Sequence, residues 1–234
     1  MKLLIIGDKT RRTELISGLQ TAIKQHAISH LHELNPDEHP DYVYDYYDVI
    51  IDISFDQHPI RREQYAHLLP HKIVLLGAAY TQLAKEFGQH LFAKTPVCNI
   101  IGFNNLPTFM HKTLWEVTTL NNKTEAEQLF EKWGVTPAWV ADRVGMVTPR
   151  IIAMIINEAC FTLQEGTATI ADIDKGMKLG TNYPYGPFEW ADKIGINYVY
   201  ELLAAVYNDT HNERYRICPL LQTYYYQNKK FTDI

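Results

Sequence analysis

The segment PRIIAMIINEACFTLQEGTATIADIDKGMKLGTNYPYGPFEWADKIG (residues 149–195) contains the clearest structural pattern in the chain. Apolar residues recur at helical spacing over residues 151–163, and Gly166 supplies a stop after them. No alternating strand pattern interrupts the sequence that follows. The chain is therefore predicted to be helical from about Val144 onward.

The turns within this segment carry their own signals. Thr169 followed by Asp172 is a capping pair that is expected to start a short helix. Gly180 is expected to close that helix in the left-handed conformation, and Pro187 stands where the next helix tolerates a missing N–H group. The glycines and prolines of this stretch are therefore interpreted as helix boundaries.

The first part of the chain has a different pattern of apolar residues. Short apolar runs at residues 3–7, 48–54, 72–78 and 99–103 read as buried parallel strands. Residues 61–69, between the second and third run, have helical spacing and suggest a βαβ arrangement. The predicted fold class is α/β: a reduced Rossmann-like parallel sheet followed by an all-helical part.

Composition limits the partners and the compartment. The 234 residues carry a net charge of -5 and contain no long Lys/Arg run, which argues against nucleic acid or an anionic membrane as the main partner. Small molecules or other proteins are the expected partners. The three cysteines, Cys98, Cys160 and Cys218, are widely spaced without a CxxC pattern, so no metal site is expected. No signal peptide or membrane span is recognised, and together with the cysteine spacing this indicates a cytoplasmic protein.

The turn after the first strand lacks most of the glycine pattern that a dinucleotide site requires. A G-x-G-x-x-G motif lets the backbone approach a pyrophosphate at a helix N-terminus. Here the sequence reads GDKTRRTEL, and Gly7 is the only glycine of the set. Lys9 and Arg11 stand where the other glycines would be and are expected to crowd a pyrophosphate. With Arg12, they form three basic residues that could attract a phosphate, although basic residues on an exposed turn are usually solvated, which is the expectation here.

The helical half resembles the C-terminal domain of the NAD-dependent 3-hydroxyacyl-CoA dehydrogenases. The match runs without a gap through residues 149–195 and continues in YRICPLL at residues 215–221. Upstream, the stretch GFNNLPTFMHKTLWEV (residues 102–117) resembles the catalytic strand and loop of that family. The resemblance implies a Rossmann-like domain over residues 1–142 and a helical dimerisation and substrate domain over residues 143–234.

The resemblance also implies a set of catalytic residues. In the family, a histidine supported by a glutamate removes the proton from the 3-hydroxyl group while hydride passes to NAD. Aligned back from Glu116, which matches the supporting glutamate, that histidine falls on Asn104; aligned on the Phe-Asn pair, it falls on Ile101. Neither residue can act as a general base. Asn157 matches the active-site amide or is a satisfied structural residue, and His111 could replace the missing base.

For the cofactor, the resemblance implies NAD, with Gly7 and Asp52 as the matching binding residues. Acyl-CoA is the implied small-molecule partner. However, only a short loop precedes the strand at residues 48–54, where the family inserts a helical hairpin that helps hold coenzyme A. The sequence thus lacks most of the glycine motif, the catalytic histidine and much of the helical hairpin that helps hold coenzyme A.

Two functions follow from these observations. One is oxidation of 3-hydroxyacyl-CoA with NAD through a replacement base, and the other is a non-catalytic dimeric binding or scaffold protein. The family's helical domain forms a two-fold dimer, and a homodimer is expected here through an apolar helix face. That face consists of Val199, Leu202, Leu203 and Val206, widened by Tyr198, Tyr200 and Tyr207. Alternatively, these residues pack only against the helix at residues 150–165.

Overall fold

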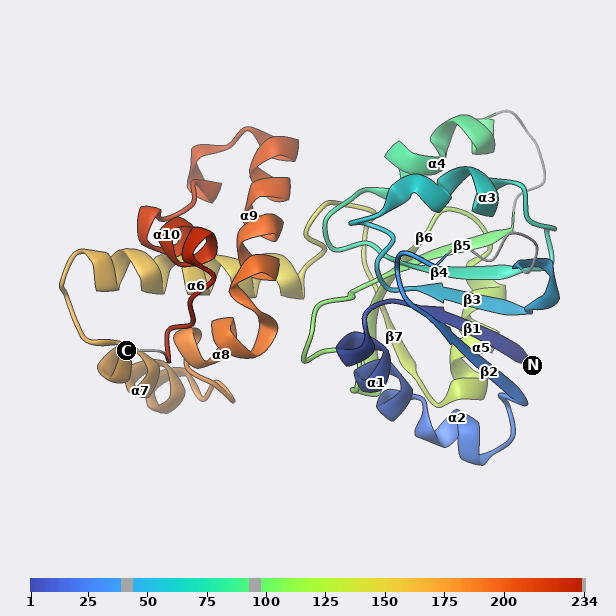
Figure 1. The fold of residues 1–234 in the computed structure, drawn as a ribbon, viewed down its shortest axis with the longest axis horizontal. Helices are drawn as coiled ribbons and strands as arrows, with labels where there is room; N and C mark the ends of the chain where they lie inside the picture. The colour runs from blue at the N-terminus through green and yellow to red at the C-terminus, as the bar shows by residue number, and fades with distance from the viewer. Residues whose placement is uncertain (39–43, 93–97, 233–234) are drawn as a thin grey trace. The chain divides into compact units, whose positions relative to one another are not determined.

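The chain divides into two compact units. The computed structural model describes residues 1–38, 44–92 and 98–232, and Figure 1 shows the ribbon. A sheet unit comprises residues 1–105 and 109–146, and a helical unit comprises Leu106–Thr108 and the chain from Val147 onward.

The sheet unit alternates strands and helices along the chain. Its elements are β1 (Lys2–Ile6), α1 (Lys9–Gly18), α2 (Gln20–Lys24), β2 (His30–Leu34), η1 (Tyr44–Tyr46), β3 (Val49–Asp52), η2 (Pro59–Arg61), α3 (Arg62–Ala66), β4 (Ile73–Gly77), α4 (Leu83–Phe92), β5 (Asn99–Phe103), β6 (Leu114–Thr119), α5 (Lys123–Trp133) and β7 (Thr136–Trp139). The predicted parallel strands are confirmed, because β1, β3, β4 and β5 pair in parallel.

The sheet has the order β2-β1-β3-β4-β5-β6-β7 within the described residues. The pair of β5 with β6 is antiparallel, and the other pairs are parallel. Strands β2 and β3 lie on opposite sides of β1. The direction in which successive strands are added to the sheet therefore reverses at β1. The carboxyl ends of β1 and β3 at this switch are the usual ligand position in such folds.

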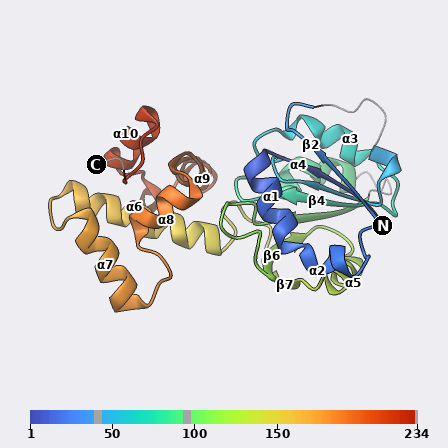
Figure 2. The same cartoon turned by 60° about the horizontal axis from the view of Figure 1, so that its bottom comes forward.

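Helices cover both faces of this sheet, as Figure 2 shows. On one face, α1, α2 and α5 pack on a core that includes Leu3, Leu15 and Trp133. On the other face, α3 and α4 pack on a core that includes Leu4 and Phe87. Both cores are apolar because side chains that alternate along each strand are buried on the two faces in turn. The predicted α/β class is confirmed.

The helical unit contains α6 (Thr148–Gln164), α7 (Ile170–Thr181), α8 (Pro187–Ile194), α9 (Ile196–Thr210), η3 (Glu213–Tyr215) and α10 (Pro219–Gln227). The capping hydroxyl of Thr169 accepts from Asp172 N (3.2 Å), and Pro187 opens α8, both as predicted. The prediction for Gly180 is wrong. Helix α7 continues through Gly180, and Asn182 takes the left-handed position at φ 57° instead. Asparagine tolerates this conformation better than other residues with a Cβ atom.

Helix α9 packs against α6, α8 and α10. Its apolar residues Val199, Leu202, Leu203 and Val206 are all at most 1% exposed within the unit. Tyr200 stacks on Tyr225 of α10 with ring centroids 3.9 Å apart. The surface on which the homodimer prediction relied is therefore largely used inside the subunit. No helix of the described residues combines the length and the apolar character needed to cross a membrane.

Candidate nucleotide and catalytic site

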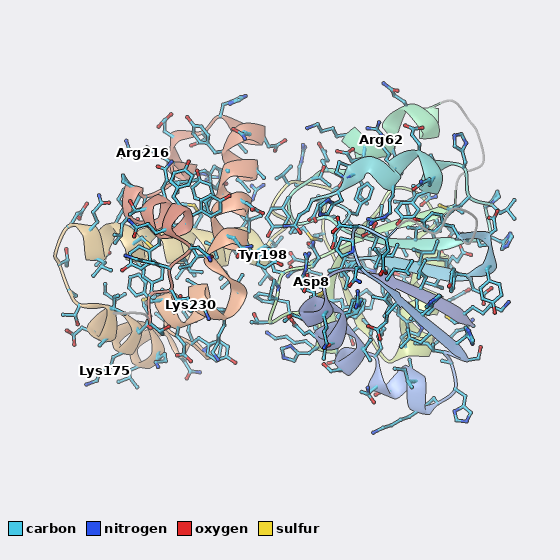
Figure 3. All side chains as sticks on the ribbon, in the orientation of Figure 1. Asp8, Arg62, Lys175, Tyr198, Arg216 and Lys230 are labelled. Atoms are coloured by element: carbon cyan, nitrogen blue, oxygen red, sulfur yellow. The ribbon has the colours of Figure 1, made fainter. Side chains whose placement is uncertain are left out.

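The turn between β1 and α1 is closed by its own side chains. Gly7 ends β1, and a Cβ atom on it would lie 3.1 Å from the Cβ of Ile53, so close packing against the neighbouring strand explains this glycine. Asp8, labelled in Figure 3, accepts a hydrogen bond from Arg11 N at 3.0 Å and caps α1. A carboxylate therefore stands at the helix N-terminus, where the family's cofactor would place a pyrophosphate.

Arg11 is buried at this turn. Its side chain donates to Asp8 from Nε, and its Nη2 donates to Ser54 Oγ (3.1 Å) and Gln57 Oε1 (2.9 Å). Ser54 and Gln57 belong to the chain that follows β3, so the guanidinium group spans the carboxyl ends of β1 and β3. Arg11 is 3% exposed. The expectation that it is solvated is wrong, because its partners come from a loop more than forty residues away.

Arg12 is also buried, at 9% exposure. Its Nη1 donates to the carbonyl oxygens of Gly7 and Leu34, both at 2.6 Å, and to Asn35 Oδ1 at 2.9 Å. The guanidinium group thereby joins the end of β1 to the end of β2. Of the three basic residues of this turn, only Lys9 is exposed as expected.

Asp52, predicted to bind the cofactor, lies at the carboxyl end of β3 and is fully buried. Its Oδ2 accepts from Arg61 Nη1 (3.0 Å) and from Tyr65 Oη (2.8 Å), and its Oδ1 accepts from Ser54 N (3.1 Å). Burial is the main cause that raises the pKa of Tyr65 well above its usual value. Both carboxylate oxygens of Asp52 are thus engaged by groups of the protein.

Asp56 and Asn105 join Arg11, Asp52 and Ser54 in a layer of polar side chains at the carboxyl ends of the strands, called the polar layer below. Asn105, fully buried after β5, donates from Nδ2 to Ile53 O (2.8 Å) and to both carboxylate oxygens of Asp56 (2.9 and 3.1 Å). Loss of hydration raises the pKa of Asp56 to about 7, although the positive charge of Arg11 acts in the opposite direction. Neither residue is among those predicted from the sequence. Their position directly after predicted strands is the signal that could have found them.

The catalytic strand brings two predicted residues together. Asn104 N, just after β5, donates to Glu116 O on β6 at 3.0 Å, and both residues are buried. Ile101, the other candidate for the histidine position, is fully buried in the apolar core of β5. Glu116 therefore has Asn104 as its neighbour across the antiparallel pair, with an amide at the position that aligns with the base.

His111 lies on the loop before β6 and is half exposed. Its Nδ1 is 3.0 Å from Glu14 Oε1 on α1, and the same oxygen accepts from Met110 N at 2.9 Å. A Cβ atom on Gly18 would lie 2.4 Å from Met110 O, which shows how closely this loop approaches α1. Glu14 thus anchors the loop and holds the imidazole of His111.

Asn157 belongs to α6 in the helical unit and is 2% exposed. Its Nδ2 donates to Arg216 O (2.9 Å), and its Oδ1 accepts from Cys218 N (2.8 Å). Both ends of the amide are used to tie α6 to the start of α10. Its assignment as a substrate-orienting residue stays a prediction, and these hydrogen bonds favour the structural alternative. Within the described residues, no group of three His, Cys, Asp or Glu side chains is arranged to hold a metal ion.

Comparison with known proteins shows which family the chain resembles. The profile of the 3-hydroxyacyl-CoA dehydrogenase C-terminal domain matches residues 145–232. A probable 3-hydroxybutyryl-CoA dehydrogenase of Bacillus subtilis (strain 168) is 27% identical over 232 residues, which covers 93% of this chain and 74% of the relative. Residues 145–232 thus match the C-terminal domain of the 3-hydroxyacyl-CoA dehydrogenases, and the chain is similar to members of that family. Its likeness to this family extends over both units.

Two further similarities agree with this assignment. A 3-hydroxyadipyl-CoA dehydrogenase of Escherichia coli (strain K12) is 45% identical over 92 residues, which covers 39% of this chain but only 19% of that relative. Among solved structures, the (S)-3-hydroxybutyryl-CoA dehydrogenase PaaH1 from Ralstonia eutropha has a TM-score of 0.70 at 20% identity, with 97% of this chain and 94% of that chain covered. At this identity, the structural match shows the fold alone.

The residues of the β1–α1 turn do not fit the NAD that this family uses. The pyrophosphate would need the free N–H groups of the first turn of α1 and open space beside Gly7. Asp8 already accepts from the Arg11 N–H group, and the Arg11 guanidinium group lies across the carboxyl ends of β1 and β3. Gly7 and Asp52 as cofactor ligands stay predictions, and the observed contacts give each of them a packing role.

Proposed function

We propose that this protein is a non-catalytic member of the 3-hydroxyacyl-CoA dehydrogenase family that serves as a homodimeric binding or scaffold protein. The observation that carries the proposal is the position of Arg11. Its guanidinium group bonds to Ser54 and Gln57 across the carboxyl ends of β1 and β3, where the family's cofactor would lie.

Binding of NAD in the family's manner would require these contacts to break. The Arg11 side chain would have to leave a buried site and its partners there, and a hydrogen bond to a charged group is worth about 1.5–3 kcal/mol. The Asp8 carboxylate would also lie beside a pyrophosphate, and two negative charges this close repel each other. Both effects oppose cofactor binding at this turn.

The catalytic strand supports the same proposal. Proton removal from a 3-hydroxyl group requires a base that can take up the proton near neutral pH, and an amide such as Asn104 cannot do so. Glu116 remains next to Asn104 through the backbone hydrogen bond between β5 and β6. The position that aligns with the family's histidine thus holds an amide and not an imidazole, so the base that the glutamate supports in the family is replaced here.

The test is turnover of acetoacetyl-CoA with NADH by the intact protein. We expect no NADH oxidation above the rate without protein, and no difference between wild type and Glu116→Gln. A matched control is Glu131→Gln, because Glu131 is exposed on α5. Robust turnover that Glu116→Gln abolishes and Glu131→Gln leaves intact would show that the chemistry persists and would overturn the proposal.

One observation favours the enzymatic alternative. His111 Nδ1 lies 3.0 Å from the Glu14 carboxylate, and a histidine held by a carboxylate is the arrangement that the family uses as its base. If His111 had taken over this role, His111→Gln would abolish acetoacetyl-CoA turnover. The exposed His71 offers the control, because His71→Gln should leave turnover unchanged.

We further propose that the helical unit carries the homodimer contact on α7. This helix has no buried residue among its twelve, yet Ile170, Ile173 and Met177 are apolar and Leu179 is 77% exposed. A single subunit covers the first three side chains only in part and leaves Leu179 largely exposed, and paired interfaces bury such surface.

Light scattering after size exclusion tests this contact. We expect a dimer at tens of micromolar for wild type, a monomer for Leu179→Asp, and a dimer for the control Leu69→Asp, since Leu69 is an exposed leucine of the sheet unit. A wild-type monomer, or a Leu179→Asp dimer, would contradict the proposed contact.

A further inference from the structure

The helical unit contains a pocket that neither the family's reaction nor the proposed homodimer contact explains. It has a volume of about 540 Å³ and lies between the first half of α6 and η3. Arg150, Arg214 and Tyr215 form its polar part, and Ile151, Met154 and Ile155 form its apolar part. All of these residues belong to the helical unit, so the pocket does not depend on the sheet unit.

Two guanidinium groups converge at the polar end. Arg150 Nη1 donates to Tyr215 Oη at 3.3 Å, and Arg214 Nη2 donates to the same phenol oxygen. The Cζ atoms of Arg150 and Arg214 lie 5.6 and 4.6 Å from the centre of the Tyr215 ring. Tyr215 is buried, and its hydroxyl group contacts both cations. Like charges this close repel each other, so the arrangement favours an anion between or beside them.

The apolar end has a different character. Ile151 is 52% exposed, although it belongs to the apolar stripe of α6, and Met154 and Ile155 are partly exposed beside it. These three side chains lie one to four positions apart along α6, so they line the same stretch of the helix. Glu158 is the acidic residue among those that line the pocket. The apolar stretch thus begins directly next to the two guanidinium groups.

We propose that this pocket binds a fatty carboxylate, with the carboxylate held by Arg150 and Arg214 and the alkyl chain on Ile151, Met154 and Ile155. A guanidinium fork matches the two oxygens of a carboxylate in geometry and charge. An alkyl chain gains free energy from covering apolar side chains that are otherwise exposed to water. The site requires neither NAD nor a catalytic base and is independent of the turn at Gly7.

Calorimetric titration of the full chain with decanoate tests the proposal. Decanol, which has the tail without the charge, and acetate, which has the charge without the tail, are the matched ligands. We expect saturable binding of decanoate, and binding of decanol and acetate that is at least about tenfold weaker, because each lacks one of the two contacts. Equal affinity for decanoate and decanol would overturn the role of the arginines.

A pair of variants locates the binding site. Arg214→Gln should weaken decanoate binding at least about tenfold, because one charged partner of the carboxylate is lost. Arg216→Gln is the control, because Arg216 is exposed two residues further along the chain and does not line the pocket; it is labelled in Figure 3. Arg214 is itself exposed, so its replacement should leave the fold intact, and circular dichroism checks this.

Three outcomes would overturn the proposal. The first is an equal effect of Arg214→Gln and Arg216→Gln, which would indicate attraction by general positive charge. The second is the absence of decanoate binding by the dimer together with binding by a monomeric variant, which would show that a second copy of the chain covers the pocket. The third is the absence of binding by either form.

Discussion

Arg11 and Arg61 both bury a guanidinium group at the carboxyl edge of the sheet, where a dehydrogenase of this family would hold its cofactor. Arg11 bonds to side chains after β3, and Arg61 forms an ion pair with Asp52, in which both side chains are fully buried. Charges buried in this way need partners, because an unpaired charge in the interior is costly. The polar layer therefore stabilises the edge of the sheet through contacts within the protein.

The Arg61–Asp52 pair gives the first prediction. Arg61→Met should lower the free energy of unfolding by about 3–5 kcal/mol, because it leaves the Asp52 carboxylate buried without its cation. Arg62→Met is the control, since Arg62 pairs with Glu63 while 42% of its side chain is exposed, and its loss should cost less than about 1 kcal/mol. Urea denaturation measures both. The double change Asp52→Asn with Arg61→Met should cost less than Arg61→Met alone, and an equal or larger cost would contradict this account.

Asp56 gives a prediction on pH. Its pKa in the folded protein is raised to about 7, whereas the unfolded chain has the ordinary value of 3.8. Between these values the folded state keeps a proton that the unfolded state releases, so this group makes the free energy of unfolding fall as the pH rises from about 4 to 7. Asp56→Asn has no such proton. The stability of the variant relative to wild type should therefore increase from about pH 5 to pH 7 and level off above that range. Stability curves of the two proteins that run parallel over this range would refute the assignment.

At the scale of secondary structure, the elements differ in how they are held. The strands β1, β3, β4 and β5 consist of nearly continuous apolar residues, and their burial on both faces makes them easy to predict. Helix α6 is held by its apolar stripe and by the amide of Asn157, which links it to the chain before α10. Helix α7 has no buried residue of its own. Its exposed apolar surface is the reason why pairing of two chains is proposed there.

The link between α6 and α10 gives the third prediction. Asn157→Ala should lower the free energy of unfolding by about 1–3 kcal/mol, because it leaves Arg216 O and Cys218 N without their partner. Asn208→Ala on the exposed part of α9 is the matched control and should have little effect. Thermal unfolding of the two variants measures the difference. If both variants melt at the wild-type temperature, the amide has no structural role and its use toward a substrate gains support.

At the scale of the whole molecule, the sequence predicted the fold better than the site. The strands, the helical half and the Thr169 cap follow from local patterns, and the family resemblance covers residues that lie together in sequence. The burial of Arg11 could not be predicted in this way, because Ser54 and Gln57 meet it only after β3 pairs with β1. Asn105 and Asp56 follow predicted strands, so their place at this edge could have been predicted, but their hydrogen bonds to each other could not. A charged residue on a turn is normally solvated, and here the tertiary structure overrides that rule.

Titration of the wild-type protein with NADH, followed by the nucleotide's fluorescence, tests the central claim most directly. A dehydrogenase of known NADH affinity serves as the positive control. Because Arg11 and Asp8 fill the β1–α1 turn, we expect no saturable binding below about a millimolar concentration of NADH, a limit that corresponds to about 4 kcal/mol of binding free energy. Saturable binding in the micromolar range would contradict the account, because it would require Arg11 to give way to the cofactor.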